Sequence, residues 1–204
     1  MTNAIRYADM AMTISWLLIY VMVLCSTIKT QHPAMPLIFC VLNLPWELIT
    51  ACGFAFSSAG FSYIAVGYLG YLVLDLGIAC TIIFSLRYHS KKQVLMYSLF
   101  FVIWTTLVWY CFRYPAGVLY TNFANTLTGI VFWIFHTARK NYPHSRLNMV
   151  ILVSKLFADV LVFVVYNSYD NVVLCISVLM IAADILHIIV FLCSAINQRT
   201  QRKK

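Results

Sequence analysis

Residues 147–166 read LNMVILVSKLFADVLVFVVY, an apolar run that contains one lysine and one aspartate near its middle. A transmembrane α-helix needs about 20 consecutive, mostly apolar residues to cross the hydrocarbon core of a bilayer. This run has that length and composition, so it predicts a membrane span. Comparable runs recur along the chain and together predict seven spans, at about 12–28, 34–56, 63–86, 94–112, 116–136, 147–166 and 172–196.

The overall composition supports a membrane protein. Of the 204 residues, 63% are apolar and 10% are charged, whereas about a quarter of the residues in a soluble domain are charged. This balance excludes a water-soluble globule. The connections between the spans are too short to fold on their own, so we expect one all-α, seven-helix transmembrane domain over residues 1–204.

The basic residues, which give a net charge of +8, lie mainly between the spans. Because Lys and Arg are enriched in cytoplasmic loops, their placement predicts an outside N-terminus and a cytoplasmic C-terminus. The outer side then holds only Arg6 and Arg113. We therefore expect a lipid bilayer, not nucleic acid, as the partner, in either the endoplasmic reticulum or a bacterial plasma membrane. The cytoplasmic side holds Lys29, Arg87, Lys91, Lys92, Arg139, Lys140, Arg146, Arg199, Arg202, Lys203 and Lys204.

The seven cysteines nearly all fall inside the apolar runs. They form no CxxC pair, and their number is odd. We interpret them as small, buried apolar residues and not as disulfides or zinc ligands.

Four of the six acidic residues lie inside predicted spans, where an ionised side chain costs at least about 2.5 kcal/mol. These are Glu47, Asp75, Asp159 and Asp184, and each lies within one or two turns of the centre of its span. We expect the four carboxyl groups to converge on one pocket near the membrane midplane.

Polar residues also surround Glu47 in the second span. Asn43 and Glu47 share a helix face at i,i+4, and Pro45 leaves the Val41 carbonyl without its helical partner. Trp46 is the aromatic residue that we expect in the pocket, whereas the other aromatic residues are typical of packing and of interface belts.

Two later spans carry further polar pairs. Lys155 and Asp159 share a face at i,i+4, and we expect a structural ion pair that Asp75 joins. Asp184 and His187 share a face at i,i+3, so His187 either orients Asp184 or bonds a neighbouring hydroxyl. In the fifth span, Asn122 and Asn125 are typical of hydrogen bonds between helices.

A neutral carboxyl in an apolar pocket is a proton donor, because a low dielectric disfavours its charged form. Dry aromatic walls can also stabilise a carbocation by cation–π attraction and exclude the water that quenches it. Protonation-initiated cyclisation of a prenyl chain fits these properties. The same carboxyl groups suit proton transport, and composition alone does not separate the two functions.

Three short elements resemble the small integral-membrane terpene cyclases of meroterpenoid and indole-diterpene pathways, of the pyripyropene and paxilline type. Residues 43–47 (NLPWE) are similar to the Asn-x-x-Trp-Glu element of that family, and residues 154–155 (SK) to its Ser-Arg/Lys element. Residues 184–187 (DILH) are similar to the last-span Asp-x-x-Tyr, and a basic tail follows them. The seven-helix layout covers the whole chain. Two positions differ: His187 replaces the usual Tyr, and Pro45 replaces a small residue, so the resemblance leaves the substrate open.

The resemblance implies that Glu47 and Asp184 are the acidic pair, one protonating a terminal epoxide or alkene and the other assisting by hydrogen bonding. The substrate would be a prenyl chain on an aromatic or heterocyclic head group, which cyclises through tertiary cations and then loses a proton. It implies no metal and no cofactor, and the chain contains neither a DDxxD nor a DxDD run. The candidates for substrate binding are Asn43, Trp46, Asp75, Lys155, Asp159 and His187.

Other functions stay open. A proton-coupled small-molecule transporter would use the same midplane carboxylates, although we find no internal repeat and few Gly or Pro interruptions. A retinal protein needs a lysine in the last span, and residues 172–196 contain none. A receptor-like DRY motif is also absent after the third span, where residues 86–88 read LRY. A purely structural membrane protein would have little use for Glu47 and Asp184.

Overall fold

A computed structural model describes residues 3–55, 63–139, 141–166 and 169–201, and this part of the chain is helical without strands. Its helices coincide with the seven apolar runs. The expected connection at 57–62 and the basic residues Lys140, Arg202, Lys203 and Lys204 lie outside the described residues. The helices are α1 (Asn3–Thr30), α2 (Leu37–Ala55), α3 (Tyr63–Cys80), which continues as the short π-helix η1 (Thr81–Ser85), α4 (Lys91–Cys111), α5 (Pro115–Thr137), α6 (Arg146–Tyr166) and α7 (Asn171–Gln201).

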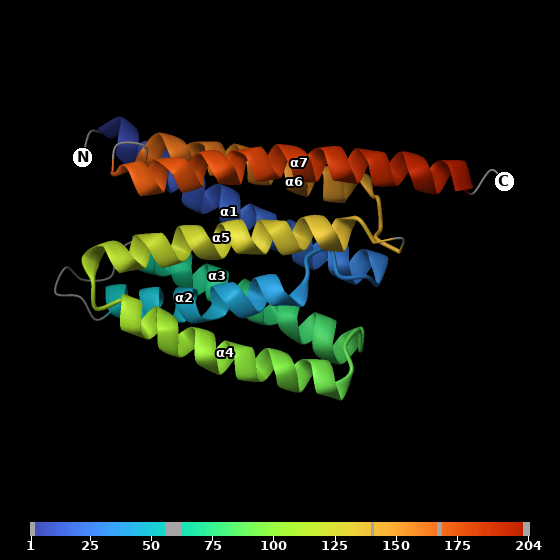
Figure 1. The fold of residues 1–204 in the computed structure, drawn as a ribbon, viewed down its shortest axis with the longest axis horizontal. Coiled ribbons are helices and arrows are strands. Elements are labelled where there is room, and N and C mark those ends of the chain that lie inside the picture. Colours follow the sequence, from blue (N-terminus) through green and yellow to red (C-terminus); the bar gives the residue numbers. More distant parts are fainter. Residues whose placement is uncertain (1–2, 56–62, 140, 167–168, 202–204) are drawn as a thin grey trace.

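The helices form a ring with one helix outside it. The main packing partners follow the order α1, α3, α2, α5, α7 and α6, and α6 returns to α1. In Figure 1, α6 and α7 lie along one edge of the bundle and α4 lies along the other. Helix α4 packs on α2 and touches α5 only sparsely, so it is the helix outside the ring. The interior of the ring is therefore enclosed by six of the described helices.

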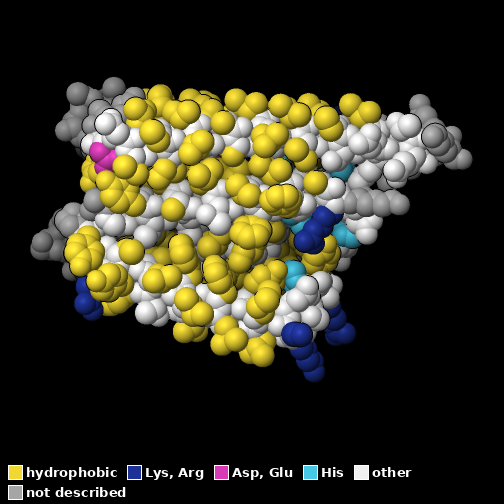
Figure 2. Space-filling model, viewed as in Figure 1, with side chains coloured by type: hydrophobic (Ala, Val, Ile, Leu, Met, Phe, Trp, Pro, Cys, Tyr) yellow, Lys and Arg dark blue, Asp and Glu magenta, His cyan; other side chains and the backbone are white. Residues whose placement is uncertain are grey.

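The outer surface is apolar, as Figure 2 shows for one face. On α4, for example, Leu95, Leu99, Val102 and Ile103 are all exposed. An apolar exterior matches a hydrocarbon environment. Five segments of the described chain are long and apolar enough to cross a membrane, which indicates a multi-pass membrane protein: Tyr7–Thr30, Val66–Ser85, Lys91–Cys111, Arg146–Tyr166 and Asn171–Gln198.

All seven cysteines are free in the structure. The expectation that they are buried is wrong for most of them, because only Cys40 is buried and Cys111 is half-buried. In a membrane protein, apolar side chains also cover the lipid-facing surface, so an apolar run does not tell which of its residues face inward. The exposed cysteines are Cys25, Cys52, Cys80, Cys175 and Cys193.

Pro45 fixes how α2 sits in the bundle. Because a proline has no N–H, the carbonyl one turn earlier loses its helical hydrogen bond. For Pro45, the sequence predicts that this is the carbonyl of Val41. The neighbouring carbonyl of Leu42 accepts a hydrogen bond from Trp104 Nε1 at 3.1 Å and one from Asn125 Nδ2 at 2.5 Å. Backbone groups inside a membrane must be satisfied within the protein. These two bonds tie the part of α2 next to Pro45 to α4 and α5, and they confirm Asn125 as a residue that joins helices.

Gly129 on α5 marks a close approach between helices. A Cβ at this position would lie 2.6 Å from Cδ2 of Phe39, whose ring packs edge-on against Trp133 at 5.4 Å between centroids. Phe39 and Trp133 are both 1% exposed, so an added methyl group would have to displace a buried ring.

We predict that Gly129→Ala lowers the thermal unfolding midpoint in detergent, because overpacking a filled core costs about 1–3 kcal/mol. The matched control is Gly53→Ala on α2, where the nearest side-chain atom would lie at an ordinary 3.6 Å. Equal midpoints for the two variants would contradict the close packing of α5 on α2.

Candidate functional site

A cavity of about 160 Å³ lies inside the ring. All six ring helices contribute to its wall, and none of its described lining residues comes from α4. The lining residues on α1, α3 and α5 lie in the N-terminal parts of those helices, so the cavity extends from the middle of the bundle toward the end where α1 begins (Figure 1). The lining includes Trp16, Tyr20, Asn43, Trp46, Glu47, Tyr68, Tyr71, Phe123, Asp159, Tyr166 and Met180.

One side of the cavity is a continuous chain of aromatic rings. The centroids of Trp46 and Tyr68 are 4.8 Å apart, and those of Tyr68 and Tyr71 are 5.6 Å apart. The chain continues from Tyr71 to Tyr20 at 5.7 Å and from Tyr20 to Trp16 at 6.1 Å. These contacts are tilted or edge-to-face, which are favoured arrangements for aromatic pairs. The wall thus runs from α2 across α3 to α1.

Glu47 belongs to a polar cluster on this side of the cavity. Its side chain is 3% exposed, and its Oε1 accepts a hydrogen bond from the Tyr20 hydroxyl at 3.3 Å. Asn43 Nδ2 donates to the same hydroxyl at 2.7 Å. The carboxyl of Asp75, which is fully buried, lies beside the carboxyl of Glu47 and the side-chain amide of Asn43. Within the described residues, Glu47 Oε2 and both carboxyl oxygens of Asp75 make no hydrogen bond of standard geometry.

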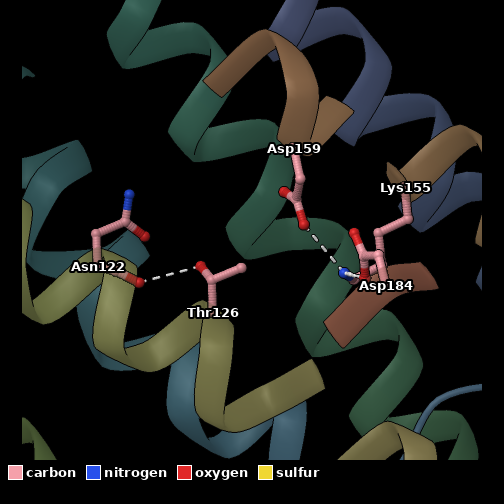
Figure 3. A network of polar contacts seen from close by, with 5 residues as sticks. All are labelled: Asn122, Thr126, Lys155, Asp159 and Asp184. Atoms are coloured by element: carbon pink, nitrogen blue, oxygen red, sulfur yellow. Dashed lines mark hydrogen bonds and ion pairs between the residues drawn. The ribbon is translucent and has the colours of Figure 1, made fainter. Parts of the chain in front are cut away.

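An ion-pair cluster lies on the other side of the cavity. Lys155 Nζ is 3.1 Å from Asp159 Oδ2 and also contacts Asp184 Oδ1 (Figure 3). It lies 5.8 Å from the centroid of the Trp16 ring. All three charged residues are buried. The expected pair of Lys155 with Asp159 is confirmed, but the third member is Asp184, whereas Asp75 lies with Glu47.

Asn122 and Thr126 complete the wall on α5. Figure 3 shows both residues on the opposite side from the ion-pair cluster. The Thr126 hydroxyl donates to the backbone carbonyl of Asn122 at 3.0 Å, so this bond does not use the Asn122 side-chain amide. Asn122 lines the cavity, unlike Asn125, which bonds the Leu42 carbonyl.

The sequence-predicted site residues thus divide into two groups. Asn43, Trp46, Glu47 and Asp159 line the cavity. The other four, Asp75, Lys155, Asp184 and His187, are buried outside its described lining.

His187 has a partner outside the cavity. Its Nε2 lies 2.7 Å from the Thr137 hydroxyl, and its ring packs against Trp133 at 5.6 Å between centroids. His187 was expected either to orient Asp184 or to bond a neighbouring hydroxyl. The structure shows the second role, and this bond joins α7 to α5.

Most of the aromatic wall consists of residues that were expected in packing contacts and interface belts. Trp16 and Tyr20 on α1 are spaced i,i+4, and Tyr68 and Tyr71 on α3 are spaced i,i+3. Such spacing places each pair on one helix face. Belt aromatics lie at the membrane interface, whereas Trp16 and Tyr20 lie well inside their span. Depth and spacing together could have indicated these residues.

We find no group of three or more His, Cys, Asp or Glu side chains that could hold a metal ion in the described part of the chain. No protein-family model, no curated protein and no solved structure matches this chain. The resemblance of residues 43–47, 154–155 and 184–187 to the membrane terpene cyclases therefore stays a prediction.

We predict that Lys155→Ala lowers the free energy of unfolding by about 3–5 kcal/mol, because it leaves Asp159 and Asp184 buried without a cation. Thermal unfolding in detergent measures the loss. The triple variant Lys155→Met, Asp159→Asn, Asp184→Asn, which carries no charge here, should recover much of it. The control is Lys29→Ala at the exposed end of α1. A Lys155→Ala protein as stable as the wild type would show that the cluster is not a structural ion pair.

Proposed function

We propose that this protein is a membrane-bound terpene cyclase. It protonates a terminal epoxide or alkene of a prenylated substrate, of the meroterpenoid or indole-terpenoid kind, and the resulting carbocation cyclises. The observation that carries this proposal is a buried carboxyl, that of Glu47, in the wall of a cavity that has a continuous chain of aromatic rings along one side. The resemblance of residues 43–47 to the membrane cyclases agrees with it.

Glu47 is the proposed proton donor. Burial and the neighbouring carboxyl of Asp75 both favour a neutral acid over two adjacent negative charges. The Tyr20 hydroxyl orients Oε1, while Oε2 has no hydrogen-bond partner among the described residues. Because Oε2 is buried in this conformation, the Glu47 side chain would have to turn toward the cavity to donate its proton to an epoxide oxygen or an alkene carbon there.

The aromatic wall would stabilise the positive charge as it moves along the folded prenyl chain. Each ring face attracts a cation, and the attraction grows when the site is dry. The cavity volume of about 160 Å³ is close to that of an apolar cavity of about 150 Å³ that binds benzene. In this conformation the cavity thus admits the reactive end of a prenyl chain, and Trp46 and Asn43 lie where they could contact it.

The ion-pair cluster would end the reaction. Asp159 lines the cavity, and its Oδ1 has no hydrogen-bond partner within the described residues. Lys155 stabilises the charged form of this carboxylate, which can then accept a proton from the last cation and leave an alkene. Asp184 acts through Lys155 as a positioning residue. The substrate is isomerised at unchanged mass, and the protein gains at Asp159 the proton that it loses at Glu47.

For the membrane topology, we propose seven spans with the N-terminus outside and the C-terminus in the cytoplasm. The basic residues support this arrangement, because dark-blue side chains in Figure 2 gather mainly at the end where α4 begins. The host membrane is the endoplasmic reticulum or a bacterial plasma membrane. The cavity then opens from the midplane toward the outer side.

We predict that membranes containing the wild-type protein convert an epoxidised or plain prenylated aromatic into an isomer of unchanged mass, detected by mass spectrometry and NMR. Glu47→Gln should lower turnover by about 10²–10⁴-fold, the usual contribution of a general acid. Asp184→Asn should lower turnover as well, because it changes the charge around Lys155. The matched control is Asp170→Asn, which lies outside the cavity lining and should keep its activity.

Normal turnover in both carboxyl variants would refute the acid assignment. If no substrate yields an isomer, and liposomes instead show proton flux that Glu47→Gln abolishes, the protein is a proton-coupled transporter.

We predict that tags at the two ends of the chain are accessible from opposite sides of the membrane, because an odd number of spans separates them. In sealed vesicles of known orientation, a protease should remove the C-terminal tag from the cytoplasmic side only. Removal of both tags from one side would refute seven spans.

A further inference from the structure

Helix α4, which lies outside the ring, borders a groove that is separate from the cavity. A groove of about 420 Å³ lies between α2, α4 and α5. Its walls are mainly apolar and include Leu42, Met96, Phe100, Phe132 and Phe135. Because α4 touches α5 only sparsely, the groove lies on the outside of the bundle, where Phe132 is 46% and Phe135 is 68% exposed. A membrane lipid could therefore reach it sideways.

The basic and histidine side chains of the lining lie at one end of this groove. Arg139, His89 and His136 line it there, at the C-terminal end of α5. His136 Nε2 is hydrogen-bonded to the Pro33 carbonyl oxygen at 2.8 Å. Partial burial lowers the pKa of His89 below its usual 6.5, and the nearby positive charge of Arg139 lowers it further, although a hydrogen bond with Gln93 acts in the opposite direction. The His89 ring is therefore neutral at pH 7. The positive charge at the groove end thus belongs to Arg139.

Arg139 has no anionic partner within the described protein. Its side chain is exposed, and both salt bridges of the described residues belong to Lys155. The dark-blue and cyan side chains at this end of Figure 2 have no magenta neighbour. All six acidic residues of the chain lie elsewhere: Asp9, Glu47, Asp75, Asp159, Asp170 and Asp184. An exposed guanidinium beside an apolar groove is therefore left for an external anion.

The length of the groove fits one leaflet. On α5 its lining runs from Arg139 to Thr128, which corresponds to about 16 Å at 1.5 Å per residue. The hydrocarbon core of a bilayer is about 30 Å thick. A molecule that extends along the groove from Arg139 to Thr128 therefore spans about half of the bilayer.

We propose that this groove binds an anionic phospholipid from the leaflet on the basic side of the membrane. Its phosphate lies on Arg139, whose guanidinium suits two parallel hydrogen bonds to phosphate oxygens. One acyl chain lies between α4 and α5 against Phe132 and Phe135. Basic pockets between transmembrane helices are known to bind anionic headgroups. The bound lipid fills the gap beside α4 and so fastens this helix to the ring. The proposal uses none of the cavity residues and does not depend on the proposed reaction.

The test uses the purified, delipidated full chain, incubated with phosphatidylglycerol and phosphatidylcholine of the same acyl chains and measured by native mass spectrometry. We expect several-fold higher occupancy by phosphatidylglycerol. Arg139→Gln should bring the ratio of the two lipids to about one. Arg139→Lys, which keeps the charge, should keep part of the preference. Thr128→Trp, which places an indole ring in the end of the groove away from Arg139, should lower the occupancy by both lipids.

The matched control is Arg113→Gln, which removes an exposed charge at the opposite end of the bundle and should leave the preference unchanged. The proposal is overturned if Arg139→Gln keeps the wild-type preference, or if Arg113→Gln loses it equally. It is also overturned if Thr128→Trp leaves the occupancy unchanged. Competition by glycerol 3-phosphate at the same concentration as the lipid would assign the site to a free phosphate. Size-exclusion profiles establish that each variant is folded.

Discussion

The ammonium group of Lys155 can lie at the centre of this bundle only because two carboxylates face it. One comes from the same helix, α6, and the other from α7. A buried charge without a partner is costly, so the rotation of α6 and α7 about their axes is fixed by this contact. The same rotation turns Asp159 and Val162 toward the cavity. The ion-pair cluster therefore shapes one side of the site, and the Trp16 ring lies against it from α1.

The opposite side of the site depends on a second constraint, the proline inside α2. The proline frees backbone hydrogen bonding inside the membrane, and Trp104 and Asn125 satisfy the Leu42 carbonyl. Helix α2 is thereby held between α4 and α5 with Asn43 and Glu47 facing the ring interior. In the ring order, α2 and α6 have no common neighbour, so the acid and the ion-pair cluster face each other across the cavity.

The position of α4 separates two environments. Inside the ring, carboxyl groups, amides and aromatic rings enclose a cavity. Outside the ring, α4 leaves an apolar groove that ends at an exposed arginine. The first is built from residues of α1, α2, α3, α5, α6 and α7, and the second from residues of α2, α4, α5 and the adjoining loops. The cavity and the groove are both lined by α2 and α5. A lipid that stabilises the packing of α4 would therefore also stabilise α2, the helix that carries Glu47.

The sequence by itself determined the helices and the local pairs. Hydropathy marks each span, because crossing a bilayer requires a continuous apolar run. The i,i+4 spacing brings Lys155 to Asp159 within one helix. Only the tertiary structure decided that Asp184 completes this pair, that Asp75 lies beside Glu47 and that Tyr20 bonds Glu47. These contacts join residues on different helices. They depend on the order and rotation of the helices, which packing between side chains sets and which no pattern within a single span records.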